Sequence, residues 1–161
     1  MALQGVLGNG SKFGYSITSP VSFVRVGQVM NYDKLLELVA NVVDTTVHST
    51  SNIMTGIPAM IPIPSFEFTV LADLDTATSP SHETLRQYSA GSGLSTAGTS
   101  LYFRFEAPTT NAQTVFRAVE FRGFVNGYTL QTPIGDKQTI KFTLIFSGGY
   151  SVYPPAASAM S

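Results

Sequence analysis

Residues 132–150, TPIGDKQTIKFTLIFSGGY, contain the most regular strand pattern of the chain. An apolar row (Ile140, Phe142, Leu144, Phe146) alternates there with a polar row (Thr139, Lys141, Thr143). Because successive side chains of a strand point to opposite faces, this alternation predicts a half-buried strand over residues 139–147. A turn is expected at residues 133–136, and Gly148-Gly149 are expected to end the strand. The segment that follows, residues 151–161, is rich in small residues and is expected to be a loose C-terminal tail.

The same alternation recurs at residues 21–30, 39–50, 66–74, 101–107 and 115–125, with a turn expected at Asn126-Gly127. One short helix is expected at residues 81–88, where Leu85 and Tyr88 share a face that can pack on the sheet. The sequence therefore predicts a mainly β fold, an antiparallel β-sandwich or barrel-like sheet with one short flanking α-helix and extended terminal arms. We expect a single domain over residues 1–161, with an N-terminal arm at 1–20, the sandwich at 21–150 and the tail at 151–161.

The long loop at residues 49–64 combines proline with apolar side chains. Its three prolines exclude a central strand, because proline cannot donate a hydrogen bond to a sheet. Five of its residues are nevertheless too apolar for a loop in water: Ile53, Met54, Ile57, Met60 and Ile61. A long apolar loop needs a surface to bury itself against. We therefore expect these five residues to contact another subunit.

The composition also favours a protein that assembles. Hydrophobic residues make up 43% of the chain and charged residues only 12%, about half the usual share. So few charges suggest that neighbouring subunits cover part of the surface, although Ser and Thr can also cover it. The net charge of −1 argues against a protein that grips nucleic acid, and the absence of cysteine excludes disulfides. Neither a secretion signal nor a membrane span is expected.

Catalytic and metal-binding patterns are missing from the sequence. His48 and His82 lie in different expected elements and have no partner at a metal-ligand spacing. No nucleophile elbow or phosphate-binding loop is present. The carboxylates with strand spacing (Glu67, Asp73, Glu106, Glu120) are better explained by a solvated sheet face than by acid–base catalysis. We therefore expect no enzyme activity, no cofactor and no metal.

The chain resembles the major tail tube proteins of long-tailed, non-contractile bacteriophages (siphovirus type), which are related in fold to the tube protein of type VI secretion. The resemblance covers residues 5–150 and consists of landmarks in a fixed order. They are Lys12-Phe13-Gly14-Tyr15, VANVVDTT at 39–46, Gly56-Ile57-Pro58, SFEFTV at 65–70, the helix at 82–88, Phe103-Arg104-Phe105, the FRGFV of 121–125, and Phe146-Ser147-Gly148-Gly149. Each landmark is a common strand pattern, and their order and spacing carry the identification.

The resemblance implies a structural virion protein that self-assembles into hexameric rings, and rings that stack into a tail tube. Its implied partners are other copies of itself, a tape-measure protein in the lumen, tail terminator and distal tail proteins at the ends, and DNA in transit. It implies assembly in the host cytoplasm and a final place in the virion tail. The apolar loop residues Ile53, Met54, Ile57, Met60 and Ile61 are then expected to contact the next ring. The polar strand residues Glu67, Thr69, Thr139, Lys141 and Thr143 are expected to face the lumen. Two other classes stay open, a phage head–tail joining or capsid decoration protein and a small-ligand-binding β-barrel.

Overall fold

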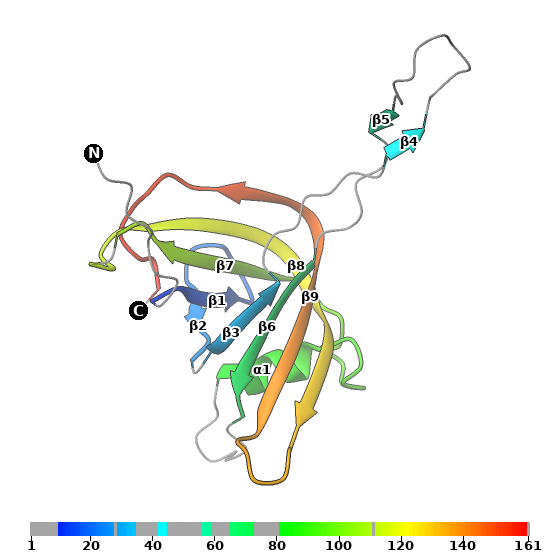
Figure 1. The fold of residues 1–161 in the computed structure, drawn as a ribbon. Coiled ribbons are helices and arrows are strands. Elements are labelled where there is room, and N and C mark those ends of the chain that lie inside the picture. The colour runs from blue at the N-terminus through cyan, green and yellow to red at the C-terminus, as the bar shows by residue number, and fades with distance from the viewer. Residues whose placement is uncertain are drawn as a thin grey trace.

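The fold was analysed in a computed structural model, which describes residues 10–27, 29–34, 42–44, 56–58, 65–72, 81–110 and 112–160. Its strands are β1 (Lys12–Ser16), β2 (Val24–Arg25), β3 (Val29–Lys34), β4 (Val42–Asp44), β5 (Gly56–Pro58), β6 (Ser65–Leu71), β7 (Leu101–Pro108), β8 (Phe116–Gln131) and β9 (Thr139–Val152). The helix α1 (Ser81–Tyr88) lies between β6 and β7 in the chain. Seven strands form one curled antiparallel sheet in the order β2-β1-β7-β8-β9-β6-β3, while β4 and β5 pair with each other away from it (Figure 1). The expectation of a mainly β antiparallel fold with one short helix is confirmed.

The two longest strands, β8 and β9, divide the sheet into two halves. Residues 139–145 of β9 pair with β6, and residues 139–146 pair with residues 123–131 of β8. Residues 150–152 of β9 pair with residues 119–121 of β8. We call β3, β6 and the paired residues 123–131 of β8 and 139–146 of β9 the hairpin half. We call β2, β1, β7 and the paired residues 119–121 of β8 and 150–152 of β9 the terminal half. The register shifts between Phe121 and Gly123, where the two halves meet. A Cβ on Gly123 would overlap the carbonyl oxygen of Ile145, so the close approach of β8 to β9 there requires glycine.

The core fills the concave side of the curled sheet and is mostly aromatic. Phe13 of β1 is fully buried and stacks on Phe66 of β6 at a centroid distance of 5.1 Å and on Phe103 of β7 at 5.8 Å. The apolar rows expected on β6, β7 and β9 are all buried (Phe66, Phe68, Val70, Leu101, Phe103, Phe105, Ile140, Phe142, Leu144, Phe146). Leu85 of α1 is also fully buried, and Tyr88 packs against the same cluster, as predicted. The turn before β9 is confirmed by Gly135, whose φ of 82° suits glycine.

Two strands run further than the sequence indicated. β8 continues through Asn126-Gly127 to Gln131, because a register shift between Val125 and Gly127 absorbs the expected turn as a bulge. β9 continues through Gly148-Gly149 to Val152, because β8 offers it a partner beyond the bend. The strand expected at residues 21–30 is divided between β2 and β3. The strand expected at residues 39–50 is described only at β4, and the remainder lies outside the described residues.

Both expected terminal arms differ from the structure. The chain enters the sheet at Lys12, since β1 pairs with both β2 and β7, so an N-terminal arm reaching residue 20 is wrong. The C-terminal segment is bound to its own subunit: Ala156 pairs with Phe116 and Met160 is only 3% exposed. The expectation that residues 151–161 form a loose arm is therefore wrong for the described residues 151–160. Within the described part of the chain, no helix has the length and apolar character needed to cross a membrane.

Candidate functional site

The five residues expected to face a lumen lie together on the convex face of the hairpin half. The antiparallel register of β6 and β9 places Glu67 opposite Thr143, Thr69 opposite Lys141, and Leu71 opposite Thr139. All five side chains are partly exposed, while the residues that alternate with them are buried in the core. Residues directly opposite each other on paired strands point to the same face. The structure therefore assembles these residues into one polar surface. The alternation predicted the polar row of each strand, and the register of β6 and β9 joins the two rows.

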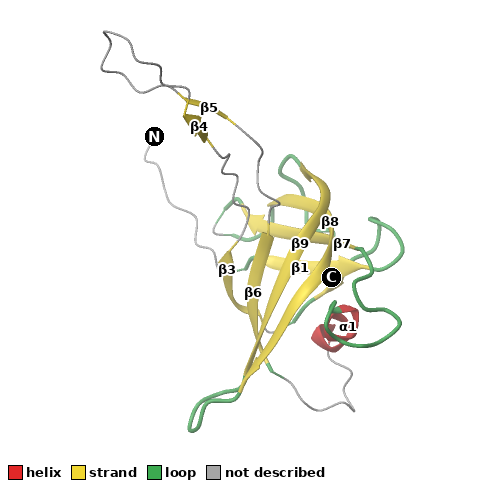
Figure 2. Cartoon of the chain, turned by 90° about the vertical axis from the view of Figure 1, so that its right-hand side faces the viewer, coloured by secondary structure: helices red, strands yellow, loops and turns green. Residues whose placement is uncertain are grey.

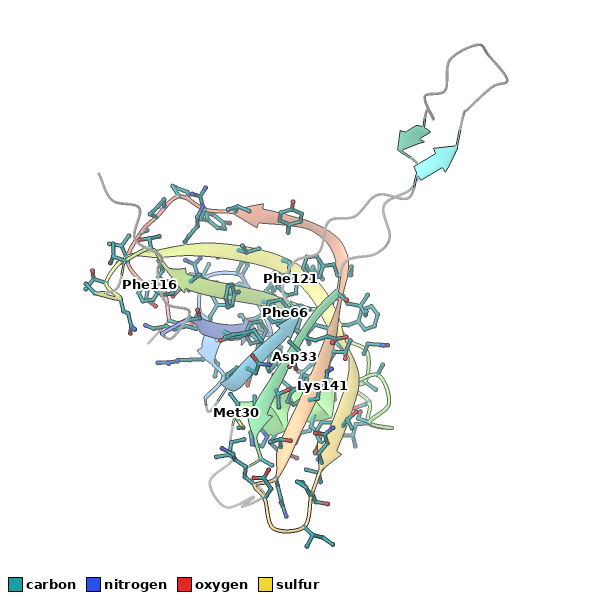
Figure 3. All side chains as sticks on the ribbon, viewed as in Figure 1. Met30, Asp33, Phe66, Phe116, Phe121 and Lys141 are labelled. Carbon is teal, nitrogen blue, oxygen red and sulfur yellow. The ribbon has the colours of Figure 1, made fainter. Side chains whose placement is uncertain are left out.

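The described charged side chains of this polar surface, among them Asp33 and Lys141 (labelled in Figure 3), bond to groups of the same subunit. Lys141 Nζ lies 3.2 Å from Glu67 Oε2 across the two strands. Asp33 of β3 accepts hydrogen bonds from Thr69 Oγ1 at 2.7 Å and from Asn31 Nδ2 at 2.7 Å. A lysine that is held by a carboxylate offers less charge to a passing phosphate. As far as its side chains are described, the surface is polar and carries no basic patch that would bind DNA.

The hairpin half has two strand edges without a partner strand among the described residues. At one edge, β3 pairs only with β6. At the other edge, β7 pairs with β8 only as far as Gly123, so residues 126–131 of β8 pair with β9 alone. Each edge carries an exposed apolar side chain, Met30 at 45% and Leu130 at 40%. Unpaired strand edges are sites at which a sheet binds further strands.

The two edges are matched in height and opposite in direction. The register runs from Val29 through Val70 and Ile140 to Leu130, so Met30 and Leu130 lie at nearly the same level across the sheet. Every neighbouring pair among β3, β6, β9 and β8 is antiparallel, so β3 and β8 run in opposite directions. A copy rotated about an axis beside the sheet would therefore place its β8 antiparallel to β3 of its neighbour.

The apolar loop that was expected to contact another subunit is described only at β5. Ile57 lies on this strand and pairs with Val43 of β4, whereas Ile53, Met54, Met60 and Ile61 lie outside the described residues. Pro58 ends β5 and lies in a two-stranded pair, where proline is tolerated. The β4–β5 pair projects from the molecule at the end opposite the tip of the β8–β9 hairpin (Figures 1 and 2). The loop's contact with another subunit stays a prediction.

A buried charge network on the terminal half was missed by the sequence analysis. Glu106 was expected on a solvated face, but its side chain is fully buried. It accepts hydrogen bonds from Arg104 Nε at 2.8 Å, Ser158 Oγ at 2.6 Å and the Ala159 backbone N–H at 2.9 Å. Arg104 also pairs with Glu120 on the adjacent strand. Arg104 and Glu106 lie two residues apart on one strand face, and this spacing was a signal for an ion pair. No signal in the sequence indicated that the C-terminal segment would cover this pair.

The hydrogen bonds of this network determine the ionisation of Glu106. Burial raises the pKa of its carboxyl, but the hydrogen bonds from Ser158, Ala159 and Arg104 outweigh burial and bring the pKa below its usual value. Burial lowers the pKa of Arg104, and its bonds to Glu106 and Glu120 outweigh that effect and raise it. Both groups are therefore charged at neutral pH. They hold residues 158–160 on the sheet, which is a structural task.

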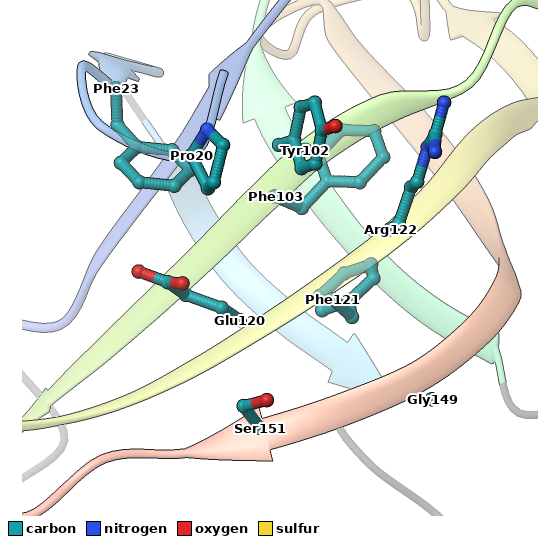
Figure 4. A pocket seen from close by; sticks show the side chains of 9 residues that line it. All are labelled: Pro20, Phe23, Tyr102, Phe103, Glu120, Phe121, Arg122, Gly149 and Ser151. Atoms are coloured by element: carbon teal, nitrogen blue, oxygen red, sulfur yellow. The ribbon is translucent and has the colours of Figure 1, made fainter.

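The terminal half also carries a shallow groove (Figure 4). It is lined by Pro20, Phe23, Tyr102, Phe103, Glu120, Phe121, Arg122, Gly149 and Ser151. Its two charged groups already have partners: Glu120 binds Arg104, and the Arg122 guanidinium lies 5.3 Å from the centroid of the Tyr102 ring. The groove therefore offers no paired nucleophile and base.

The described residues contain no cluster of His, Cys, Asp and Glu that could hold a metal ion. His82 is buried on α1, whereas His48 and Asp73 lie outside the described residues.

Comparison with known proteins gives a consistent result at the level of fold. No protein-family model matches the chain, and no curated protein matches it. A chain from the tail of an empty gene transfer agent (GTA) particle, refined with C6 symmetry, superposes with a TM-score of 0.64 at 11% identity, covering 93% of this chain and 100% of that chain. A chain of the SPP1 tail tube has a TM-score of 0.59 at 14% identity, covering 92% and 78%. A chain of the six-fold symmetrised baseplate of the anti-feeding prophage has a TM-score of 0.61 at 7% identity, covering 95% and 97%.

One of the similar structures is a contractile system. A further match, a chain from the sheath/tube terminator structure of an extracellular contractile injection system, has a TM-score of 0.60 at 7% identity and covers 96% of this chain and 100% of that chain. The comparison thus does not single out the non-contractile tails that the sequence resembles. At these identities, what is shared is the fold, and the chain has the fold found in phage tail tubes, gene transfer agent tails and contractile injection systems.

Proposed function

We propose that this protein is the structural subunit of a tail tube of the siphovirus type, without enzyme activity of its own. Six copies form a ring, and rings stack into a tube that surrounds a tape-measure protein and later conducts DNA into the host. Tail terminator and distal tail proteins bind the two ends of the tube. The subunit is made in the host cytoplasm and becomes part of the virion tail. The likeness to a tail chain with C6 symmetry supports six copies per ring.

The observation that carries this proposal is the pair of unpaired, antiparallel edges of the hairpin half. Joining β3 of one copy to residues 126–131 of β8 in the next copy continues the sheet from subunit to subunit. The same rotation repeated closes a ring, because an interface between two different surfaces generates a closed ring when the rotation fits. A closed ring leaves no strand edge of the hairpin half exposed. In such a ring the convex polar surface lines the lumen, and the aromatic core lies behind it.

The polar surface suits passage of DNA. Lys141 lies on this surface, and Glu67 holds its ammonium group at 3.2 Å. Tight phosphate binding requires clustered free Lys and Arg, because each phosphate contact adds to the affinity. A wall of threonines with internally paired charges lets DNA move without being trapped.

The lateral contact is tested by crosslinking two engineered cysteines, since the chain has none of its own. The double variant Met30→Cys/Leu130→Cys is treated with a short bifunctional maleimide and run on a denaturing gel. We expect a ladder of covalent species that ends at the hexamer, and electron micrographs of the same sample should show rings or tubes. Each single variant is the matched control and should give no ladder. A protein that stays monomeric by ultracentrifugation at micromolar concentration would refute the proposal.

A further inference from the structure

The tip of the β8–β9 hairpin exposes an apolar side chain at the end of the molecule. Residues 132–138 join the two strands and extend past β6, which ends at Leu71 opposite Thr139. Ile134, at this tip, is 105% exposed, the highest value among the large apolar residues of the described chain. A fully exposed isoleucine lacks the favourable free energy that burial of its apolar side chain would supply. Such a residue at the end of a paired hairpin is a candidate contact point.

The turn that carries Ile134 has a defined shape. Gly135 adopts a positive φ of 82°, which suits glycine, and Pro133 restricts the backbone before Ile134. The Asp136 carboxylate accepts a hydrogen bond from the Lys137 backbone N–H at 2.7 Å. At the base of the hairpin, Thr139 Oγ1 donates to Gln131 Oε1 at 3.4 Å. A turn with a defined backbone positions Ile134 before contact, so less backbone entropy is lost when the turn binds.

The opposite end of the hairpin half carries a complementary apolar surface. Ile145 continues the convex row of Lys141 and Thr143, and it replaces that polar row with an apolar side chain. Phe124 lies directly opposite Ile145 on β8, so both side chains share this face. Both are partly exposed in the isolated subunit. The β4–β5 pair projects at this same end, and the hairpin tip projects at the other (Figures 1 and 2).

We propose that Ile134 of one subunit packs against Phe124 and Ile145 of a copy in the adjacent ring. This inference rests on the proposed tube, and it adds the hairpin tip as a second surface that stacks rings, distinct from the apolar loop at residues 49–64. The occupant is a second copy of this chain, because the tip and its receiving surface lie at opposite ends of the same sheet half. Repeating this contact along the strand direction joins ring to ring without limit, as an open head-to-tail contact does.

Assembly of the full-length variant Ile134→Asp tests the contact, with Leu94→Asp as the matched control. Leu94 is also exposed, at 48%, but it lies in the loop after α1. We expect Ile134→Asp to form rings normally and to need a protein concentration about tenfold higher or more before tubes appear in electron micrographs, because a charge replaces a buried isoleucine. The conservative variant Ile134→Leu and the control should form tubes at the wild-type concentration.

A second measurement identifies the receiving surface. In one chain, Ile134 and Ile145 lie about 30 Å apart by strand rise, so cysteines at both positions cannot react within a subunit. The double variant Ile134→Cys/Ile145→Cys should form disulfide-linked multimers in tubes and none in isolated rings. Tubes of Ile134→Asp at the wild-type concentration, loss of rings in that variant, or no crosslinks in intact tubes would each overturn the inference. Wild-type protein that forms neither rings nor tubes would instead overturn the proposed function.

Discussion

Replacing Glu106 with glutamine tests the buried network that fastens the C-terminal segment to the sheet. Glutamine keeps the shape of the side chain, but it removes the charge and turns one acceptor oxygen into a donor. Three donors point at this carboxylate, from Arg104, Ser158 and the Ala159 backbone. At least one of them loses its acceptor in the variant, and Arg104 loses one of its two carboxylate partners.

The cost follows from the burial of the pair. Breaking a buried ion pair from one side typically costs about 3–5 kcal/mol, because the remaining charge is left in the interior. Arg104 keeps Glu120 as a partner, so we expect about 3 kcal/mol, the lower end of that range. Glu67→Gln is the matched control, because Glu67 also pairs with a cation across strands but both side chains are partly exposed, at 28% and 41%. Exposed pairs contribute about 0–1 kcal/mol.

Urea unfolding followed by circular dichroism measures both variants as dissociated subunits. With a slope of about 2 kcal/mol per molar urea, Glu106→Gln should lower the unfolding midpoint by about 1.5 M and Glu67→Gln by less than about 0.5 M. The C-terminal residues should also become sensitive to carboxypeptidase in Glu106→Gln alone. Equal shifts of the midpoint in the two variants would refute the assignment of Glu106 as a buried anchor.

Three further outcomes are expected. The folded-state pKa of Glu106 lies below its usual 4.5, so its stabilising contribution is present above that pH and is lost as pH falls through the lowered pKa. In urea titrations, the difference in unfolding free energy between wild type and Glu106→Gln should therefore be constant near neutral pH and shrink in acid. Gly123→Ala should lower the melting temperature clearly, because its Cβ would overlap the Ile145 carbonyl, whereas Gly148→Ala, where no atom lies within 4 Å, should change the unfolding free energy by no more than about 0.5 kcal/mol; equal losses would contradict the close approach of β8 and β9. In tubes, a bulky maleimide should label Thr143→Cys slowly, and faster after dissociation into rings, while Phe142→Cys stays unlabelled until unfolding; equal rates for Thr143→Cys in tubes and rings would place that face outside the lumen.

The sequence predicted those parts of the fold that depend on a local period. The alternation on β6, β7 and β9 placed Phe68, Phe103 and Phe142 in the core, because a period of two leaves only one face for them. The alternation gave a wrong prediction where a segment distant in the sequence determines pairing or burial. Gly148-Gly149 stop a strand only if no neighbour continues beside it, and here β8 does. Glu106 looks solvated by alternation, and it is buried because residues 158–160 return to cover it.

The candidate surfaces were likewise predicted only where they depend on the local alternation. The alternation placed Thr143 and Lys141 on one face, and the register confirmed that they share it with Glu67 and Thr69. The two strand edges could not be predicted, because they depend on where β7 stops pairing with β8. The exposure of the tip residue Ile134 could not be predicted either, because a turn signal describes the backbone and says nothing of the exposure of its side chains.

The scarcity of charge has a structural explanation in how the charges are placed. Ion pairs within the subunit join Arg86 to Glu83, Arg104 to Glu106 and Glu120, and Lys141 to Glu67. At the hairpin tip and at the two edges of the hairpin half, the exposed apolar residues of the described chain are Ile134, Met30 and Leu130. The centres of protein interfaces are depleted of charge because each unpaired ion buried there costs free energy. A chain that pairs these charged side chains internally and leaves apolar side chains at opposite edges and at one end has the surface that the proposed assembly requires, around a ring and along a tube.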